Sequence, residues 1–340
     1  MSPTPSPATA WLDGARLFAT LAVIVIHVVA PPLFQFSGSS PLRFNFFNLV
    51  DSICRFAVPF FLMITGALLL GKDTPILVFL KKRYARILVP FAFWSVVYAV
   101  WYYLRRDAPA SPDFLPYLAR ALTDGAAYHL WYIYLLAGLY LVIPILARWV
   151  SQPGTDLLRY YLSIWAIGLF FGATGIRFNE NFDLTVFSGY VGYLVLGHVL
   201  ATARIPLSTR LVALLFVGAV VVTFAAVWLG SLSRGRFHGE PYGDLTPNVA
   251  IASAALFLLF RRHFQVSQLW LGRIKTLNRV SFGVYLIHLL TLDMLSSIGL
   301  DGNTLHPLLG VPVSVLACYL LSATAILVLS RLPLLGRVVQ

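Results

Sequence analysis

The chain has 340 residues, of which 59% are hydrophobic and only 11% are charged, and its mean hydropathy is +0.81. Soluble domains carry about 25% charged residues, so this composition excludes a pair of ordinary soluble domains and indicates helices exposed to lipid. The formal charge of +12 suits nucleic acid or a membrane surface. Because the basic residues lie in short segments between apolar runs rather than on one soluble face, nucleic-acid binding is not expected.

Apolar stretches near the length needed to cross a bilayer, about 20 residues, recur along the whole chain. They are interpreted as helices, since backbone groups in lipid must be satisfied within the segment. We therefore expect an all-α polytopic membrane protein with about ten transmembrane helices. The expected spans are 12–31, 49–70, 86–104, 128–147, 158–173, 186–202, 210–230, 246–261, 277–298 and 311–331. The fifth, sixth and eighth are short, which leaves their boundaries and the count open.

The N-terminal residues 1–10 are rich in Ser, Thr and Pro and are predicted to form a disordered tail. Residues 11–335 are expected to form a single transmembrane domain, with no appended soluble domain. A cleaved signal peptide is the alternative for the first 30 residues. Against it, no basic residue precedes Arg16, and His27 interrupts the apolar stretch.

The distribution of Lys and Arg predicts the orientation of the chain. If the N-terminus lies inside, the inner loops hold about twice as many basic residues as the outer loops. Both termini are therefore expected in the cytoplasm.

The first span carries two ionisable residues, which are costly in a membrane and are therefore functional candidates. Arg16 and His27 are eleven residues apart, so they share one helical face roughly 16 Å apart along the axis. A neutral imidazole can take a proton from a hydroxyl, and a guanidinium suits a phosphate or carboxylate. The alternative interpretation makes His27 a hydrogen-bonded packing residue and pairs Arg16 with Asp13 at the helix end.

Further polar residues mark other spans. Arg83 and Arg86 share a helical face at the cytoplasmic end of the third span, where they can hold the phosphates of an anionic carrier such as coenzyme A. Ordinary positive-inside topology or contact with anionic lipid is the alternative.

Four more candidates lie at or inside span ends, and a fifth lies mid-span. Arg55 comes early in the second span, and His288 lies within the ninth. His129, Trp131 and Tyr132 open the fourth span at its outer end, where aromatic faces can stack on a sugar ring. Each one alone can be a satisfied core group.

In this order, these residues resemble the acyltransferase family 3 membrane proteins, and especially the surface-polysaccharide O-acetyltransferases that lack a soluble domain. The resemblance covers essentially the whole chain. Its most specific elements are a basic residue, ten spacers and a His in the first helix (Arg16 to His27) and an Arg-x-x-Arg element (Arg83 to Arg86). The stretches 55–66, 128–134 and 281–288 are also similar, with Thr65 where the family often has Ser.

The resemblance implies transfer of an acyl group, commonly acetyl, from cytoplasmic acyl-CoA to a surface glycan or a lipid-linked sugar. It implies that residues 11–335 are an acyltransferase domain in a bacterial inner membrane. His27 is implied to be catalytic together with Arg16, and Arg16, Arg83 and Arg86 are implied to bind the acyl donor. The expected acceptor-binding residues are His129, Trp131, Tyr132, His288 and Arg55.

No metal cofactor is expected, because Cys54 and Cys318 are the only cysteines and both lie in apolar runs. The expected partners are the glycan acceptor and membrane lipids. The oligomeric state, the acyl group, the acceptor hydroxyl and the choice between base and acyl carrier for His27 remain open. A transporter or flippase for a glycolipid-like substrate and a non-catalytic partner of a polysaccharide assembly complex are the alternative functions.

Overall fold

A computed structural model describes residues 10–36, 40–105, 113–152, 154, 156–175, 189–304, 306–332, 335–336 and 338. All its elements are helical, and no strand occurs in this part of the chain. The main helices are α1 (Ala10–Phe34), α2 (Pro41–Cys54), α3 (Ala57–Leu69), α4 (Ile76–Leu104), α6 (Trp131–Val150), α7 (Asp156–Thr174), α8 (Val191–Thr202), α9 (Thr209–Arg234), α10 (Pro247–His263), α11 (Gln268–Ser297) and α12 (Pro307–Leu329). Shorter pieces are α5 (Phe114–Arg120), a π turn (Ala121–Gly125) and the 3₁₀ turns Tyr128–Leu130 and Glu240–Tyr242. The predicted all-α class is confirmed.

Within the described residues, nine helices are long and apolar enough to cross a membrane. Helices α2 and α3 together count as one of the nine, Pro41–Leu69. The apolar helix α8 is shorter and lies where the span 186–202 is expected. The chain is therefore a multi-pass membrane protein. Residues 1–9 of the predicted tail lie outside the described residues, and Ala10 already belongs to α1.

The second expected span, 49–70, is wrong in its start and its continuity. The helix begins at Pro41 and breaks at Arg55–Phe56, between α2 and α3. Pro59 explains the break, because a proline lacks the N–H that would bond to the carbonyl four residues earlier and its ring clashes with that carbonyl. The carbonyl concerned is that of Arg55, and the break turns this residue toward the interior.

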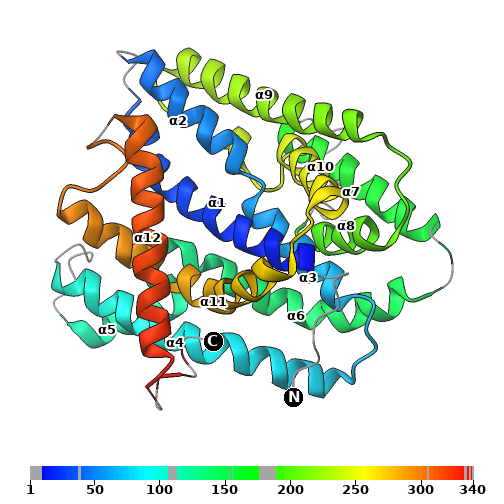
Figure 1. The fold of residues 1–340 in the computed structure, drawn as a ribbon, viewed down its shortest axis with the longest axis horizontal. Coiled ribbons are helices and arrows are strands. Elements are labelled where there is room, and N and C mark those ends of the chain that lie inside the picture. The colour runs from blue at the N-terminus through cyan, green and yellow to red at the C-terminus, as the bar shows by residue number, and fades with distance from the viewer. Residues whose placement is uncertain are drawn as a thin grey trace.

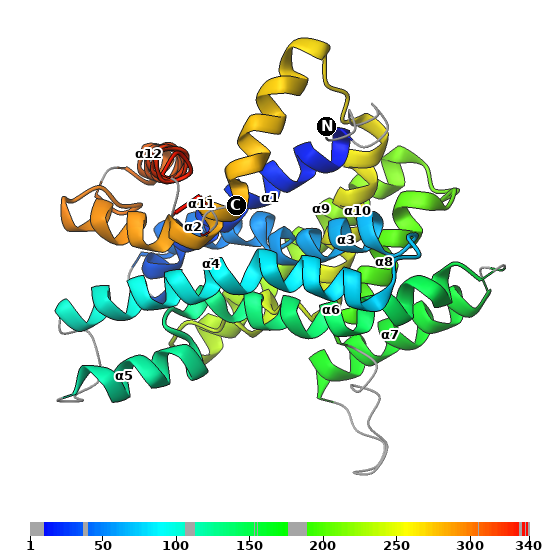
Figure 2. The same ribbon diagram turned by 90° about the horizontal axis from the view of Figure 1, so that it is seen from below.

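The ninth expected span, 277–298, is also too short at its N-terminal side. Helix α11 begins at Gln268, so Arg273, Lys275 and Arg279 are helical and not part of a loop. Charged residues in this stretch end the apolar span but do not end the helix, since Arg and Lys have high helix propensity. Figure 2 shows this first part of α11 standing away from the bundle beside the start of α1.

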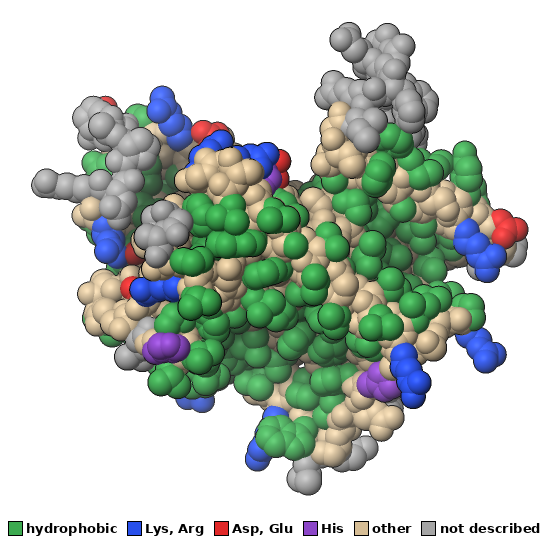
Figure 3. Space-filling view, turned by 90° about the horizontal axis from the view of Figure 1, so that it is seen from above, with side chains coloured by type: hydrophobic (Ala, Val, Ile, Leu, Met, Phe, Trp, Pro, Cys, Tyr) green, Lys and Arg blue, Asp and Glu red, His purple; other side chains and the backbone are tan. Residues whose placement is uncertain are grey.

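Helix α1 runs through the middle of the bundle, between α9 on one side and α4 on the other (Figure 1). It packs against α2, α3, α11 and α12. Ala15, Ala19 and Ala22 are buried on it, and such small side chains let membrane helices approach closely. The face shown in Figure 3 is largely apolar, with Lys and Arg around its margins.

Helices α3 and α8 cross with their backbones in contact, and two glycines make this possible. A Cβ atom on Gly66 would lie 1.9 Å from the carbonyl oxygen of Leu194. A Cβ atom on Gly197 would lie 2.2 Å from the carbonyl oxygen of Met63. This crossing fixes the position of α3, whose first turns carry Val58 and Phe61, two residues that line the cavity described next.

Candidate active site

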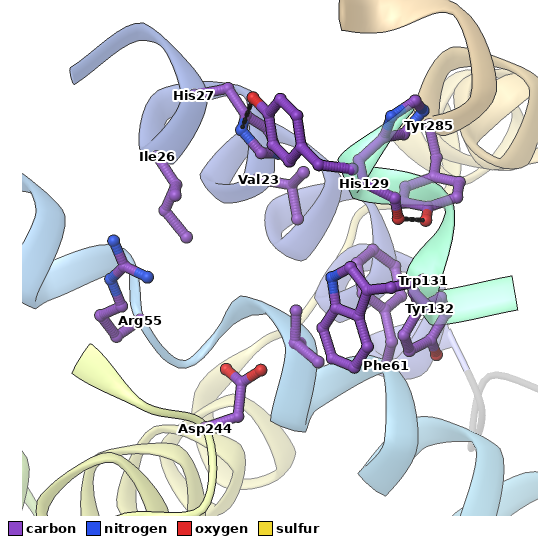
Figure 4. A pocket seen from close by; sticks show the side chains of 12 residues that line it. Val23, Ile26, His27, Arg55, Phe61, His129, Trp131, Tyr132, Asp244 and Tyr285 are labelled. Carbon is purple, nitrogen blue, oxygen red and sulfur yellow. Dashed lines mark hydrogen bonds between the residues drawn. The ribbon is translucent and has the colours of Figure 1, made fainter. Parts of the chain in front are cut away.

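A cavity of ≈ 140 Å³ opens beside His27. For comparison, an engineered cavity of about 150 Å³ holds one benzene ring, so this space fits a single six-membered ring. Its walls come from α1, the α2–α3 break, α3, the start of α6, the segment before α10, and α11 (Figure 4). The lining residues are Val23, Ile26, His27, Arg55, Val58, Phe61, Tyr128, His129, Trp131, Tyr132, Asp244 and Tyr285.

His27 belongs to a group of three imidazoles in which His288 contacts both of the other rings. Its ring centroid lies 5.0 Å from that of His288, and the rings of His129 and His288 are 5.1 Å apart. The three side chains come from α1, the 3₁₀ turn before α6, and α11. His288 does not line the cavity but lies behind His27 and His129, where it is fully buried.

Backbone carbonyls assign the tautomers of two of these rings, because a carbonyl oxygen can only accept a hydrogen bond. Nδ1–H of His288 donates to the Tyr285 carbonyl at 2.6 Å, and Nε2–H of His129 donates to the Leu286 carbonyl at 3.4 Å. The second nitrogen of each ring is buried and has no hydrogen-bond partner among the described residues. Both rings therefore turn a lone pair into the interior beside His27.

The ring of His27 is held by Tyr128. The Tyr128 hydroxyl lies 3.0 Å from Nδ1 of His27, and the two rings meet edge to face at 5.4 Å. If Nδ1 carries the proton and donates to the hydroxyl oxygen, Nε2 is left as a base. If the hydroxyl donates instead, Nε2 carries the proton. The first of these two arrangements is the one that general-base chemistry requires.

The guanidinium of Arg55 is bound on one side by its own helix. It forms an ion pair with the buried carboxylate of Asp51 one turn earlier and lies 4.2 Å from the ring centroid of Tyr242. Its side chain is 22% exposed and faces the cavity. Arg55 is thus fixed in place before any ligand arrives.

Asp244 lies across the cavity from Arg55 (Figure 4). The hydroxyl of Tyr190 lies beside its carboxylate, and the hydroxyl of Tyr193 donates to its backbone carbonyl. Arg55 and Asp244 form no ion pair with each other. Opposite charges therefore face the same space, each held by other neighbours.

The three arginines expected to bind the donor meet at the other end of α1. Arg16 of α1 and both Arg83 and Arg86 of α4 lie within electrostatic reach of Tyr140 on α6. None of the three is ion-paired within the described part of the chain, and Nε of Arg83 is buried without a partner there. Three cations, of which only Arg16 has a carboxylate (Asp13) within electrostatic reach, form a site for an anion of high charge.

Asp13, the partner of Arg16 in the alternative interpretation, lies within electrostatic reach of Arg16 but forms no ion pair with it among the described residues. The carboxylate of Asp13 accepts a hydrogen bond of 2.6 Å from the side-chain amide of Asn278 instead. Arg16 itself does not line the cavity. It lies within electrostatic reach of Tyr132, which is one of the lining residues.

The sequence model of the acyltransferase domain family matches residues 9–323. The chain belongs to this acyltransferase family. It is also 30% identical to an amino-acid racemase of Enterococcus faecalis over 126 residues, which are 36% of this chain and 17% of that protein. The chain thus covers well under a fifth of that relative. No solved structure matches the chain.

Most of the predicted site residues lie in two groups. His27, Arg55, His129, Trp131 and Tyr132 line the cavity. The arginines expected to bind the donor form the second group. His288 packs against the rings of His27 and His129 in the first group. Within the described residues, no group of three or more His, Cys, Asp or Glu side chains is arranged to hold a metal ion.

The sequence did not point to one charged residue of the cavity, Asp244. It lies in a stretch expected to be an outer loop, and no helical spacing relates it to other candidates. The only signal is weak: an acid shortly before Thr246–Pro247, the pair that begins α10. Its position opposite Arg55 follows from the packing of α10 against α1 and α3.

Proposed function

We propose that this membrane acyltransferase is an O-acyltransferase that moves an acyl group, acetyl in the simplest case, from acyl-CoA to a sugar hydroxyl. The acceptor is a surface polysaccharide or its lipid-linked precursor. One observation carries the proposal: the imidazole of His27 faces a ring-sized cavity, and one lining residue, Tyr132, lies within electrostatic reach of Arg16 in the arginine group.

The arginine group supports an acyl-CoA donor. Coenzyme A carries several phosphates, and guanidinium groups bind phosphate through paired, charge-assisted hydrogen bonds. Arg83 and Arg86 lie at the start of α4, the end expected to face the cytoplasm, where acyl-CoA is found. Arg16, on α1, is the arginine of this group that lies within electrostatic reach of the cavity-lining Tyr132. In this arrangement the nucleotide binds to α4 and the pantetheine arm extends along α1.

The cavity supports attack by a hydroxyl on a thioester. Nε2 of His27 takes the proton of the acceptor hydroxyl while its oxygen forms a bond to the acyl carbon. The carbon–sulfur bond then breaks, and the thiolate of coenzyme A takes the proton from the imidazolium. An acyl-imidazole intermediate is the alternative route. Val23, Ile26 and Phe61 give the cavity apolar walls, which keep competing water away from the thioester.

The proposal is tested with the full chain purified into nanodiscs, given acetyl-CoA and a panel of glycans. Release of the coenzyme A thiol and the mass of the acylated glycan are both measured. His27→Gln keeps a polar side chain of similar size and is expected to lower acceptor-dependent thiol release by at least about a hundredfold. His198→Gln is the matched control, because His198 is a partly buried histidine of α8 that does not line the cavity.

Two outcomes would overturn the proposal. Thiol release by His27→Gln at the wild-type rate would remove His27 from the reaction. The second outcome is wild-type protein that consumes no thioester with any acceptor. If the same protein, reconstituted into lipid vesicles, moves a glycolipid or solute across the membrane, the transporter alternative is favoured.

A further inference from the structure

Arg55 and Asp244 present opposite charges to one cavity without pairing with each other. Each is anchored elsewhere: Arg55 by Asp51 and Asp244 by the hydroxyl of Tyr190. Neither side chain has to break an existing ion pair with the other when a ligand enters. The gap between them is therefore a preformed place for polar groups of a ligand.

The balance of charge around this gap is negative. Asp51 and Asp244 are acidic, and Arg55 is the only Lys or Arg among the lining residues described. Because Asp51 is fully buried and already paired with Arg55, the single positive charge of Arg55 is shared between two carboxylates and does not neutralise both. A carboxylate on the ligand would meet Asp244 as a like charge and bind more weakly than a neutral group.

A hydroxyl group fits both walls. It donates to a carboxylate and accepts from a guanidinium, so two or more hydroxyls on one ring can bind both Asp244 and Arg55. The indole of Trp131 also lines the cavity and offers an aromatic face to the ring (Figure 4). The cavity of ≈ 140 Å³ limits the bound part to a single ring.

We infer that the cavity binds one uncharged sugar ring of the acceptor through Arg55 and Asp244, and that Asp244 makes the enzyme reject acidic sugars. This inference rests on the proposed acyl transfer to a sugar hydroxyl. It goes further by giving the acceptor a charge class and by assigning the discrimination to one carboxylate.

The test compares two acceptors that differ by one group: a methyl hexopyranoside and the matching methyl hexuronoside, in which a carboxylate replaces the primary alcohol. Acetyl transfer is measured by mass spectrometry with full-length protein in nanodiscs. Wild type is expected to acylate the neutral glycoside at least about tenfold faster, in kcat/KM, than the uronoside. In Asp244→Asn this ratio is expected to approach one, while transfer to the neutral glycoside falls because a hydrogen-bond acceptor is lost.

The ratio of two rates in one preparation does not depend on how much protein is folded, so partial misfolding of Asp244→Asn leaves the test valid. Glu240→Gln is the matched control. It removes a charge four residues away on an exposed side chain and is expected to keep the wild-type ratio.

Three results would overturn the inference. Equal use of the two glycosides by wild type would show no charge selection, and an unchanged ratio in Asp244→Asn would place the selection elsewhere. Competitive inhibition by a zwitterion such as L-serine, lost in Asp244→Asn, would show that the two charges bind an amino acid instead. In each case His27-dependent transfer can persist. Absence of any transfer by wild type would instead overturn the proposed function, and this inference with it.

Discussion

Nδ1 of His27 and the hydroxyl of Tyr128 lie 3.0 Å apart, although the two residues are a hundred positions apart in the chain. Tyr128 belongs to the 3₁₀ turn that leads into α6, and His27 to the C-terminal half of α1. The contact joins two of the helices that form the cavity. The direction of this hydrogen bond also decides which ring nitrogen of His27 carries the proton.

Tyr128→Phe is expected to lower kcat by about ten- to a hundredfold, because a lost hydrogen bond of about 1–3 kcal/mol leaves His27 free to adopt the wrong tautomer or orientation. KM for acetyl-CoA is expected to stay near the wild-type value, since Tyr128 lies far from the group of arginines. Steady-state kinetics with varied acetyl-CoA check both values.

Tyr134→Phe is the control for that substitution. It removes the hydroxyl of a neighbouring tyrosine that bonds to the Leu122 carbonyl and does not line the cavity. If both variants lose activity equally, Tyr128 acts through the stability of this region and not through His27.

Arg83→Gln and Arg86→Gln are expected to raise KM for acetyl-CoA by about tenfold each, with little change in kcat at saturating donor. Loss of a charge-assisted hydrogen bond to phosphate costs about 1.5–3 kcal/mol. Raising the ionic strength is expected to weaken donor binding to wild type more than to these variants.

Lys81→Gln is the control for the arginine variants. It removes the same charge from an exposed residue of the same helix that is not within reach of Tyr140. An equal rise in KM in Lys81→Gln would attribute the effect to the general charge of this end of α4.

Asp51→Asn is expected to destabilise the fold by about 3 kcal/mol, because it leaves the guanidinium of Arg55 buried without its carboxylate. The double variant Asp51→Leu with Arg55→Met removes both charges and is expected to recover most of this stability while remaining inactive. Reversible unfolding in mixed micelles measures the free energy of each variant. Equal stability of Asp51→Asn and wild type would mean that solvent reaches the pair.

Gly66→Ala is expected to destabilise the protein by about 1–3 kcal/mol, since the added methyl group overlaps the Leu194 backbone and forces α3 and α8 apart. Gly218→Ala is the control, because a Cβ atom there meets nothing within 4 Å. In a helix interior that second change is expected to be neutral or to stabilise by up to about 1 kcal/mol. The same unfolding assay separates the two, and equal effects would contradict the close crossing.

Both termini are expected in the cytoplasm. Fusion of a reporter that fluoresces only in the cytoplasm to the C-terminus is expected to give signal, and fusion of a periplasm-dependent phosphatase at the same place is expected to give none. The opposite pattern would reverse the orientation on which the donor and acceptor sides of the proposed reaction depend.

The sequence alone determined the class of the protein and the geometry within single helices. Hydropathy identified an all-α membrane chain because lipid forces each apolar segment to satisfy its own backbone. Helical periodicity put Arg83 and Arg86 on one face, since the rise and turn of a helix are constant. It did not identify the break after Cys54, although Pro59 carries the physical reason for it.

Only the tertiary structure decided which helices meet and at what height. The approach of Arg16 to Tyr140, the bond between His27 and Tyr128, and the position of Asp244 opposite Arg55 all join segments far apart in the chain. Such contacts depend on where helices cross, and crossings depend on small residues such as Gly66 that let two backbones touch. No spacing within one helix encodes the height of the neighbouring helix. The cavity and the residues that line it could therefore be identified only from the packed helices.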